Sequence, residues 1–383
     1  MKKVLHLISG GDVGGAKTHV LTLVKELQKN LTVKIICFIE GPFAQEARDM
    51  GIDIQVLPQQ RRYDLKVIDT LIKIIRDEGF TLIHSHGARA NFITRFIKRK
   101  LTIPCVTTIH SDFMLDFKGN LYKHIIFTNL NIFALKRFDY FIAVSESFRE
   151  MLISRGFPKD KIFTVYNGMD FDEDISYESK KSFLEKRGLY HLKDKKLIGI
   201  LARLHPVKGH EIFIKAAADM LASNDNIHFL ITGNAEEMPA LNNLIKQLGI
   251  GQNIHFIGFV DAPYDFLNVI DINVLTSYSE SFPYVLLEGA RLKKPTISSK
   301  VGGIPMLIED GENGYLFKAG DSNELSKKLK VMLTDEAMSK AMGEALYKKA
   351  SDNYSLKKLA LNHINIYNTM LENKKEGNTN ENN

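Results

Sequence analysis

Short β-branched runs alternate with segments of helical periodicity over most of the chain. Seven such runs, beginning with KVLHLIS, precede an acidic and poorly periodic stretch, and six more follow it. Strands that alternate with helices predict βαβ units, whose strands lie parallel in one sheet. We therefore expect an α/β protein with two parallel-sheet domains, and a ligand crevice at the carboxyl ends of the strands.

The same pattern predicts where the domains begin and end. The first should cover residues 1–168 and the second residues 195–354, with a linker region over 169–194 where the sequence turns polar. Helical patterns close the chain, the last of them over about residues 355–372. The tail, residues 373–383, is too polar to fold, so we expect it to be disordered.

The composition is that of a globular protein of enzyme size. Of the 383 residues, 44% are hydrophobic and 25% are charged, which is enough for two separate cores. Cys37 and Cys105 lie far apart in apolar runs, so we expect no disulfide framework, no cysteine metal site and a cytoplasmic location. No stretch reaches the roughly 20 apolar residues of a spanning helix, so membrane contact would be peripheral.

Positive charge is concentrated in the first part of the chain. Residues 1–169 hold 25 Lys and Arg against 16 Asp and Glu, whereas the remainder holds 26 against 29. The segment RANFITRFIKRK (89–100), which we call the basic segment, has five cations and no acid. Such a face can hold a protein to an anionic membrane surface, and it can equally be the solvated side of an ordinary helix.

A glycine-rich turn, ISGGDVGGAKTHV, follows the first predicted strand. Glycines let the backbone approach a ligand closely, and the next helix offers free N–H groups to an anion near Gly15. Lys17 lies in the first turn of that helix, where a bound anion would offset its charge. The glycine spacing is not that of a dinucleotide fingerprint, which disfavours a nicotinamide site.

Histidines follow the fourth and fifth predicted strands, in IHSHGAR and TIHSD. His84 and His86 have no carboxylate or thiol set nearby, which argues against a zinc site. For His110, a hydrogen bond to a substrate hydroxyl is our main expectation and a structural role the alternative. For His84 the structural role is the expectation.

In the second half, Arg203 and Lys208 flank a proline turn between a strand and a helix. Two cations in such a place suit a diphosphate, because Arg binds it as a fork and Lys as a point charge. Further on, Glu280 lies in a loop and Glu288 about five residues into a helix that begins near Pro283. That separation suits one extended ligand better than one metal ion.

These motifs together resemble a known family. GGAKTHV, TIHSD, VSES, VYNGMD, ARLHPVKGHE, FIGFV, SESFPYVLLEGA and VGGIPMLIEDGENGYLF occur in this order over almost the whole chain. The ordered set resembles the family-four retaining glycosyltransferases of GT-B fold (glycosyl transferases group 1). The resemblance implies two Rossmann-like domains facing a central cleft, with a C-terminal helix that crosses back to the first domain.

The resemblance also implies an activity. A hexose-type sugar would pass from a nucleotide-diphosphate sugar, with a UDP-sugar as the expected donor, to an acceptor hydroxyl with retention. The basic first domain with its apolar edges, rather than the resemblance, suggests the acceptor: a lipid-linked glycan in cell-surface polysaccharide synthesis, handled at the inner face of the plasma membrane. No metal or other cofactor and no nucleic acid is expected.

The site residues implied by the resemblance fall into three groups. The catalytic residues would be His110, Arg203, Lys208 and Glu280. The residues that bind the donor would be Gly15, Gly258, Phe259, Ser281, Phe282, Pro283, Tyr284 and Glu288. The candidates on the acceptor side are Lys17, His86, Asp112 and Asn167.

Two other functions fit the same architecture. A sugar-nucleotide epimerase of related fold would need no acceptor, and a non-catalytic subunit would bind the nucleotide sugar without turning it over. The motifs around Arg203 and Glu280 favour the transferase over the epimerase, and the non-catalytic subunit stays open as an alternative.

Overall fold

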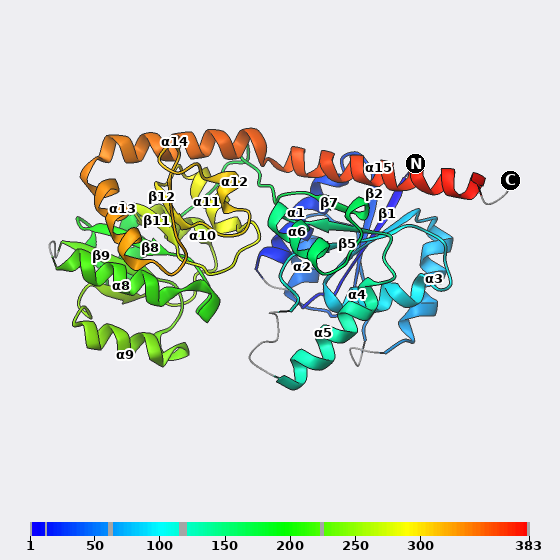
Figure 1. The fold of residues 1–383 in the computed structure, drawn as a ribbon, viewed down its shortest axis with the longest axis horizontal. Coiled ribbons are helices and arrows are strands. Elements are labelled where there is room, and N and C mark those ends of the chain that lie inside the picture. The colour runs from blue at the N-terminus through cyan, green and yellow to red at the C-terminus, as the bar shows by residue number, and fades with distance from the viewer. Residues whose placement is uncertain (1, 12–13, 60–63, 115–120, 223–225, 381–383) are drawn as a thin grey trace. The chain divides into compact units, whose positions relative to one another are not determined.

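The protein consists of two compact units, each built around one parallel sheet (Figure 1). The computed structural model describes residues 2–11, 14–59, 64–114, 121–222 and 226–380. One unit contains residues 1–168 and 356–383, and the other contains residues 169–355. The predicted fold class, two Rossmann-like α/β domains, is confirmed.

The first unit has a seven-stranded sheet in the order β3-β2-β1-β4-β5-β6-β7, with every pair parallel. Its strands are β1 (Lys3–Ile8), β2 (Thr32–Cys37), β3 (Ile54–Val56), β4 (Leu82–His86), β5 (Cys105–Ile109), β6 (Tyr140–Ala143) and β7 (Ile162–Thr164). Its helices are α1 (Gly15–Leu27), α2 (Pro42–Asp49), α3 (Val67–Glu78), α4 (Gly87–Ile97), α5 (Leu121–Leu135), α6 (Glu146–Ser154) and α15 (Leu356–Asn380).

The second unit has a six-stranded parallel sheet in the order β10-β9-β8-β11-β12-β13. Its strands are β8 (Lys196–Ile200), β9 (Ile227–Ile231), β10 (Ile254–Phe256), β11 (Ile272–Leu275), β12 (Thr296–Ser299) and β13 (Tyr315–Phe317). Its helices are α7 (Lys180–Lys186), α8 (His210–Leu221), α9 (Pro239–Leu248), α10 (Pro263–Val269), α11 (Tyr284–Arg291), α12 (Ile304–Leu307), α13 (Ser322–Thr334) and α14 (Glu336–Asn353).

Different helices cover the two faces of the first sheet. Successive side chains of a strand point to opposite faces. On β1, Leu5 and Leu7 therefore pack with α3 and α4, whereas Val4 and Ile8 pack with α1, α2 and α15. His6 lies between Val4 and Ile8 in the alternation, so its imidazole is on the same face as α1 and α15.

Helix α15 is part of the first unit although it comes last in the chain. Leu359, Tyr367 and Met370 are almost completely buried in the same core as α1. The Tyr367 hydroxyl also lies 2.7 Å from Nδ1 of His84 on β4. The helix thus contributes both apolar surface and a polar contact to the first sheet.

The end of the chain differs from the sequence-based expectation. Helix α15 continues to Asn380, so the residues expected as a disordered tail are helical up to that point, and 381–383 lie outside the described residues. Extending an existing helix adds one hydrogen bond per residue fixed, and polar residues such as Glu and Lys support it. The polar composition therefore excluded a core but not a helix.

The expected linker region also differs. Residues 169–194 belong to the second unit and include α7. Phe183, Leu184 and Leu192 are fully buried there, in a core shared with α10. Because only a few apolar residues stand among many charged ones, the helical periodicity was not visible in the sequence.

We predict that Tyr367→Phe destabilises the protein. The substitution keeps the ring but removes the hydroxyl, which leaves Nδ1 of His84 buried without its partner. A loss of this kind costs about 1–3 kcal/mol, which for a unit of this size lowers the melting temperature by roughly 3–8 °C. The matched control is Tyr177→Phe, because the Tyr177 side chain is 45% exposed. Equal melting temperatures for the two variants would contradict the prediction.

Candidate functional site

In the second unit, a turn before α8 is joined to the loop that follows β11. The turn is the short 3-10 helix Pro206–Lys208. The amide of Tyr278 donates to the carbonyl oxygen of Val207 at 2.8 Å, and the Thr276 hydroxyl donates to that of Lys208 at 2.9 Å. Gly209 has a φ of +63°, and a Cβ there would collide with the Thr276 carbonyl oxygen. These contacts fix the distance between Lys208 and the loop.

The junction brings Lys208 and Glu280 into an ion pair. Nζ of Lys208 lies 2.6 Å from Oε1 of Glu280, and the Ser277 hydroxyl donates to the same oxygen at 2.6 Å. Only 17% of the Lys208 side chain and 9% of the Glu280 side chain are exposed. The predicted catalytic residue Arg203 has an exposed side chain just before this turn. One cation is therefore held in place by an acid, and the second is exposed.

Glycines after β12 support the loop that carries Glu280. Gly302 has a φ of +57°, and a Cβ there would collide with the carbonyl oxygen of Glu280. The amide of Gly303 donates to the carbonyl oxygen of Ser281 at 2.7 Å. The motif VGG thus keeps the backbone of residues 280–281 in one position.

Helix α11 begins directly after this loop. Pro283 is its N-cap residue, and the neighbouring Phe282 and Tyr284 are buried, with 1% and 7% exposure. Glu288, half-buried in the middle of the helix, has its pKa raised from 4.5 to about 7 because burial disfavours the charged form. The carboxyl group of Glu288 can therefore both accept and donate hydrogen bonds near neutral pH.

Gly258 and Phe259 lie at the end of β10. The amides and carbonyls of Gly233 and Gly258 bond to each other in both directions, at 2.8 and 3.2 Å. The Phe259 side chain, next to this bridge, is 79% exposed. A large exposed ring beside a rigid glycine pair is a surface that a planar ligand group can cover.

In the first unit, most of the predicted acceptor-side residues have protein partners. Nζ of Lys17 lies 2.5 Å from Oε2 of Glu46, and Asp112 accepts from Arg155 at 2.8 Å. Asn167 is bonded to His19 at 2.9 Å. Gly15 begins α1, and Gly14 before it caps the helix with a φ of +66°. His86 is only 1% exposed, which places its imidazole among side chains of the first unit.

Six histidines gather at the carboxyl end of the first sheet, on the face covered by α1 and α15. They are His6 on β1, His84 and His86 on β4, His110 after β5, His19 on α1 and His363 on α15. We call them the histidine cluster. Burial is the main cause that lowers the pKa of each of them, to about 4 for His19 and about 3 for His363. All six are therefore neutral at pH 7.

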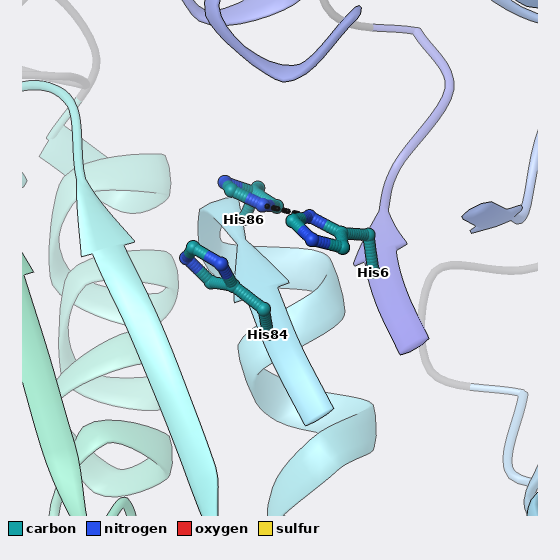
Figure 2. A group of neighbouring side chains, drawn as sticks. All are labelled: His6, His84 and His86. Carbon is teal, nitrogen blue, oxygen red and sulfur yellow. Dashed lines mark hydrogen bonds between the residues drawn. The ribbon is translucent and has the colours of Figure 1, made fainter. Parts of the chain in front are cut away.

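Hydrogen bonds connect the histidine cluster internally. Nδ1 of His6 lies 3.0 Å from Nε2 of His86, and Nδ1 of His86 lies 3.2 Å from Nε2 of His110. Figure 2 shows the His6 and His86 rings meeting above His84. His84 is bonded separately, to Tyr367 and to Thr108, both at 2.7 Å.

One ring nitrogen from each of His6, His84 and His86 lies within 4.8 Å of the other two, close enough to consider a metal ion. A tri-histidine set is a known arrangement for zinc. Both nitrogens of His84, however, already have oxygen partners, and those of His6 and His86 that face each other share a hydrogen bond. The arrangement fits a hydrogen-bonded network better than a metal centre.

The basic segment is less free than its sequence indicates. Arg95 is 7% exposed and donates to the carbonyl oxygen of Phe133 at 2.6 Å. Lys98 pairs with Asp139, and Lys100 with Asp69 at 2.7 Å. The acids come from distant parts of the chain, which is why the local sequence showed none. Among the described residues, none of the helices has the length and hydropathy needed to cross a bilayer.

The sequence did not show that His6, His19 and His363 join His110 in the histidine cluster. The sequence did contain one indication of the cluster, because His6 and His84 each interrupt an otherwise apolar strand. These two strands are neighbours in register, with His6 opposite His84. The contribution of α15 could not be found from local patterns, because His363 lies more than 250 positions further along the chain.

Comparisons with known proteins cover both units. The model of "Glycosyl transferases group 1" matches residues 183–349, and that of "Glycosyltransferase Family 4" matches residues 13–173. The chain is 28% identical to N-acetyl-alpha-D-glucosaminyl L-malate synthase of Bacillus anthracis over 82% of this chain and 81% of that protein. It is 25% identical to the UDP-Gal:alpha-D-GlcNAc-diphosphoundecaprenol alpha-1,3-galactosyltransferase of Escherichia coli, covering 89% of this chain and 90% of that one.

A solved structure shares the fold. The Anabaena protein Alr3699/HepE, crystallised in complex with UDP and glucose, aligns with a TM-score of 0.81 and 20% identity, covering 96% of this chain and all of that one. At this identity the likeness concerns the fold alone, and it agrees with the GT-B architecture expected from the motifs.

We predict that Gly302→Ala destabilises the protein by at least 2 kcal/mol more than Gly249→Ala. Both positions have a positive φ, +57° and +69°, so an alanine pays about 1–2 kcal/mol of backbone strain in each. Only at Gly302 does the added Cβ collide with backbone, whereas at Gly249 nothing lies within 4 Å. Thermal unfolding of both variants measures the difference, and a Gly302 variant as stable as the Gly249 variant would show that the loop yields easily.

We also predict a pH-dependent gain in stability for Glu288→Gln. As the pH rises from 4.5 to about 7, the unfolded chain releases the Glu288 proton while the folded chain retains it, so wild-type stability falls. Glutamine cannot ionise. The variant should therefore gain about 1–3 kcal/mol over wild type at pH 8.5 and show no gain of this origin at pH 4.5. The control is Glu236→Gln, an exposed carboxylate of the same unit, and a gain that is the same at both pH values would contradict the assignment.

Proposed function

The chain belongs to the glycosyltransferases of GT-B fold described by the group 1 and family 4 models, and we propose that it transfers a hexose-type sugar from a nucleotide-diphosphate sugar to an acceptor hydroxyl. The proposed donor is a UDP-sugar. Two relatives support this choice, since the solved Anabaena protein binds UDP and glucose and the Escherichia coli enzyme is named for UDP-Gal.

The observation that carries the proposal is the fixed position of Lys208. Its ammonium group is held by Glu280 in a pair that is mostly shielded from water. A donor diphosphate brings two or more negative charges, which can take over part of this pairing without a large movement of Lys208. The exposed Arg203 can then close on the same phosphates as a planar fork.

The two glutamates bind different ends of the donor in this proposal. Glu280 and the backbone N–H groups at the start of α11 address the sugar, where Ser281 and Tyr284 contribute to selectivity. Glu288 binds the ribose hydroxyls. Its raised pKa suits that role, because a carboxyl group can accept a hydrogen bond from a ribose hydroxyl when ionised and donate one to it when protonated. The base would lie at Gly258 and Phe259, with Gly15 against the phosphates.

We propose retention at the anomeric carbon by a displacement on one face. The bond from the anomeric carbon to the diphosphate oxygen breaks while the acceptor oxygen bonds to the same face of that carbon. The acceptor proton passes to the departing diphosphate oxygen. Glu280 is already engaged by Lys208 and Ser277, which disfavours it as a covalent nucleophile. Lys208 and Arg203 offset the charge on the leaving group, so no metal is required.

The proposed acceptor is a lipid-linked glycan of cell-surface polysaccharide synthesis, reached from the cytoplasmic face of the membrane. The Escherichia coli relative is named for a diphosphoundecaprenol-linked acceptor. The excess of positive charge in residues 1–169 supports peripheral contact with anionic lipid, although several cations of the basic segment are paired within the first unit. The acceptor would contact Lys17, Asp112 and Asn167.

The activity is tested by nucleotide release from the purified full chain across UDP-, GDP- and ADP-sugars, each with lipid-linked and soluble acceptors. We predict release from a UDP-hexose that depends on an acceptor, and a loss of about 100-fold or more in kcat for Lys208→Met. The control is Lys215→Met, which changes an exposed lysine on α8 and should leave the rate unchanged.

Three outcomes of this assay would contradict the proposal. The donor sugar could be epimerised with no transfer, which is the reaction of an epimerase. The donor could bind but never react with any acceptor, as in a non-catalytic subunit. Finally, Lys208→Met could leave the rate unchanged, which would remove Lys208 from the diphosphate site. The membrane contact is tested separately, by mixing the protein with anionic vesicles at low salt and sedimenting the vesicles. A protein that does not sediment with them would rule the contact out.

A further inference from the structure

We propose that His6 and His86 act as positioning residues that fix the tautomer of His110, so that His110 carries its proton on Nδ1. The three imidazoles form one hydrogen-bonded chain from the interior of the first unit to the carboxyl end of β5. The role given to His110 beside the donor sugar rests on the proposed function. The tautomer itself rests on the geometry of the first unit alone.

This hydrogen-bonded chain of three imidazoles allows only two proton arrangements. A neutral imidazole has one nitrogen that donates and one that accepts. Both nitrogens of His86 are hydrogen-bonded, one to His6 and the other to His110. One nitrogen of His86 must therefore accept a hydrogen bond and the other must donate one. All protons in the chain therefore point toward His110, or all point toward His6.

The inner end of the chain decides between the two arrangements. Nε2 of His6 is buried and has no hydrogen-bond partner among the described residues. If the protons pointed toward His6, this nitrogen would carry a buried N–H with no acceptor, which is the rarer of the two kinds of unsatisfied group. If they point toward His110, the same nitrogen is only an unused lone pair. His6 then donates to His86, and His86 donates to Nε2 of His110.

The outer end of the chain then presents a defined donor. Because Nε2 of His110 accepts from His86, its proton lies on Nδ1, which forms no hydrogen bond to the described part of the chain. His110 is half-buried, whereas His6 and His86 are 0% and 1% exposed. The ring of His19 meets that of His110 edge to face at 4.8 Å, which restricts its rotation. A sugar oxygen beside His110 would thus meet an N–H group that cannot switch to an acceptor.

The other members of the histidine cluster are not part of the hydrogen-bonded chain formed by His6, His86 and His110. His84 has its two nitrogens bonded to Tyr367 and Thr108, and Nδ1 of His363 is bonded to the carbonyl oxygen of Leu359. His363 is as deeply buried as His6, which makes it a matched control for the loss of a buried imidazole.

The tautomers can be read directly by nitrogen NMR of the full chain labelled with ¹⁵N-histidine. Protonated and unprotonated ring nitrogens have well-separated shifts, and single variants assign the signals among the 12 histidines. We expect His110 protonated on Nδ1 in the wild type and a mixture of tautomers in His86→Leu, with no change in His363→Leu. A wild-type His110 protonated on Nε2, or His110 signals that do not respond to His86→Leu, would overturn the proposal.

Kinetics with the UDP-hexose donor provide the second readout. We expect His86→Leu to lower kcat at least tenfold with a smaller change in the donor KM. His86→Gln, whose amide can both accept and donate, should recover part of the loss, and His363→Leu should retain the wild-type rate. Equal losses in His86→Leu and His363→Leu would mean that both act only on stability. Absence of any turnover in the wild type would count against the proposed function and leave the NMR result as the test of the tautomer.

Discussion

Parallel strand pairing is the constraint on which the rest of this structure depends. Because all strands of a sheet run in one direction, the residues that follow them meet at one edge. In the first unit this brings His110, after β5, next to His86 at the end of β4. In the second it brings the turn after β8 against the loop after β11, where Lys208 and Glu280 pair. The order of the strands thus positions both the His86–His110 pair and the Lys208–Glu280 pair.

Much of this could be predicted from the sequence, since the alternation of strands and helices is a local property. The same local view identified Lys208, Glu280 and Glu288, because each stands at a recognisable position after a strand or inside a helix. It could not show that Lys208 pairs with Glu280, which lies 72 positions away, or that α15 supplies His363 and Tyr367 to the first sheet. Helix α7 was missed because its buried residues are few and surrounded by charge.

Burial has opposite consequences for ionisable groups in the two units. In the first, six imidazoles are kept neutral, since removing water disfavours their charged form, and His6, His86 and His110 bond to one another in a chain. In the second, Lys208 and Glu280 have opposite charges, so each offsets the cost of burying the other. A neutral network suits groups that must hold one orientation, whereas an ion pair suits a site that exchanges one anion for another.

The position of α15 in the chain has a consequence for biosynthesis. The first unit consists of residues 1–168 together with 356–383, and its core includes Leu359, Tyr367 and Met370. A ribosome makes the N-terminal part first, but that part lacks the α15 residues of its core until the second unit has been made. The second unit is continuous in sequence and can fold as soon as it has left the ribosome. The unit that is begun first is therefore the last to be completed, and the face of its sheet that packs on α1, α2 and α15 stays partly uncovered until the final helix arrives.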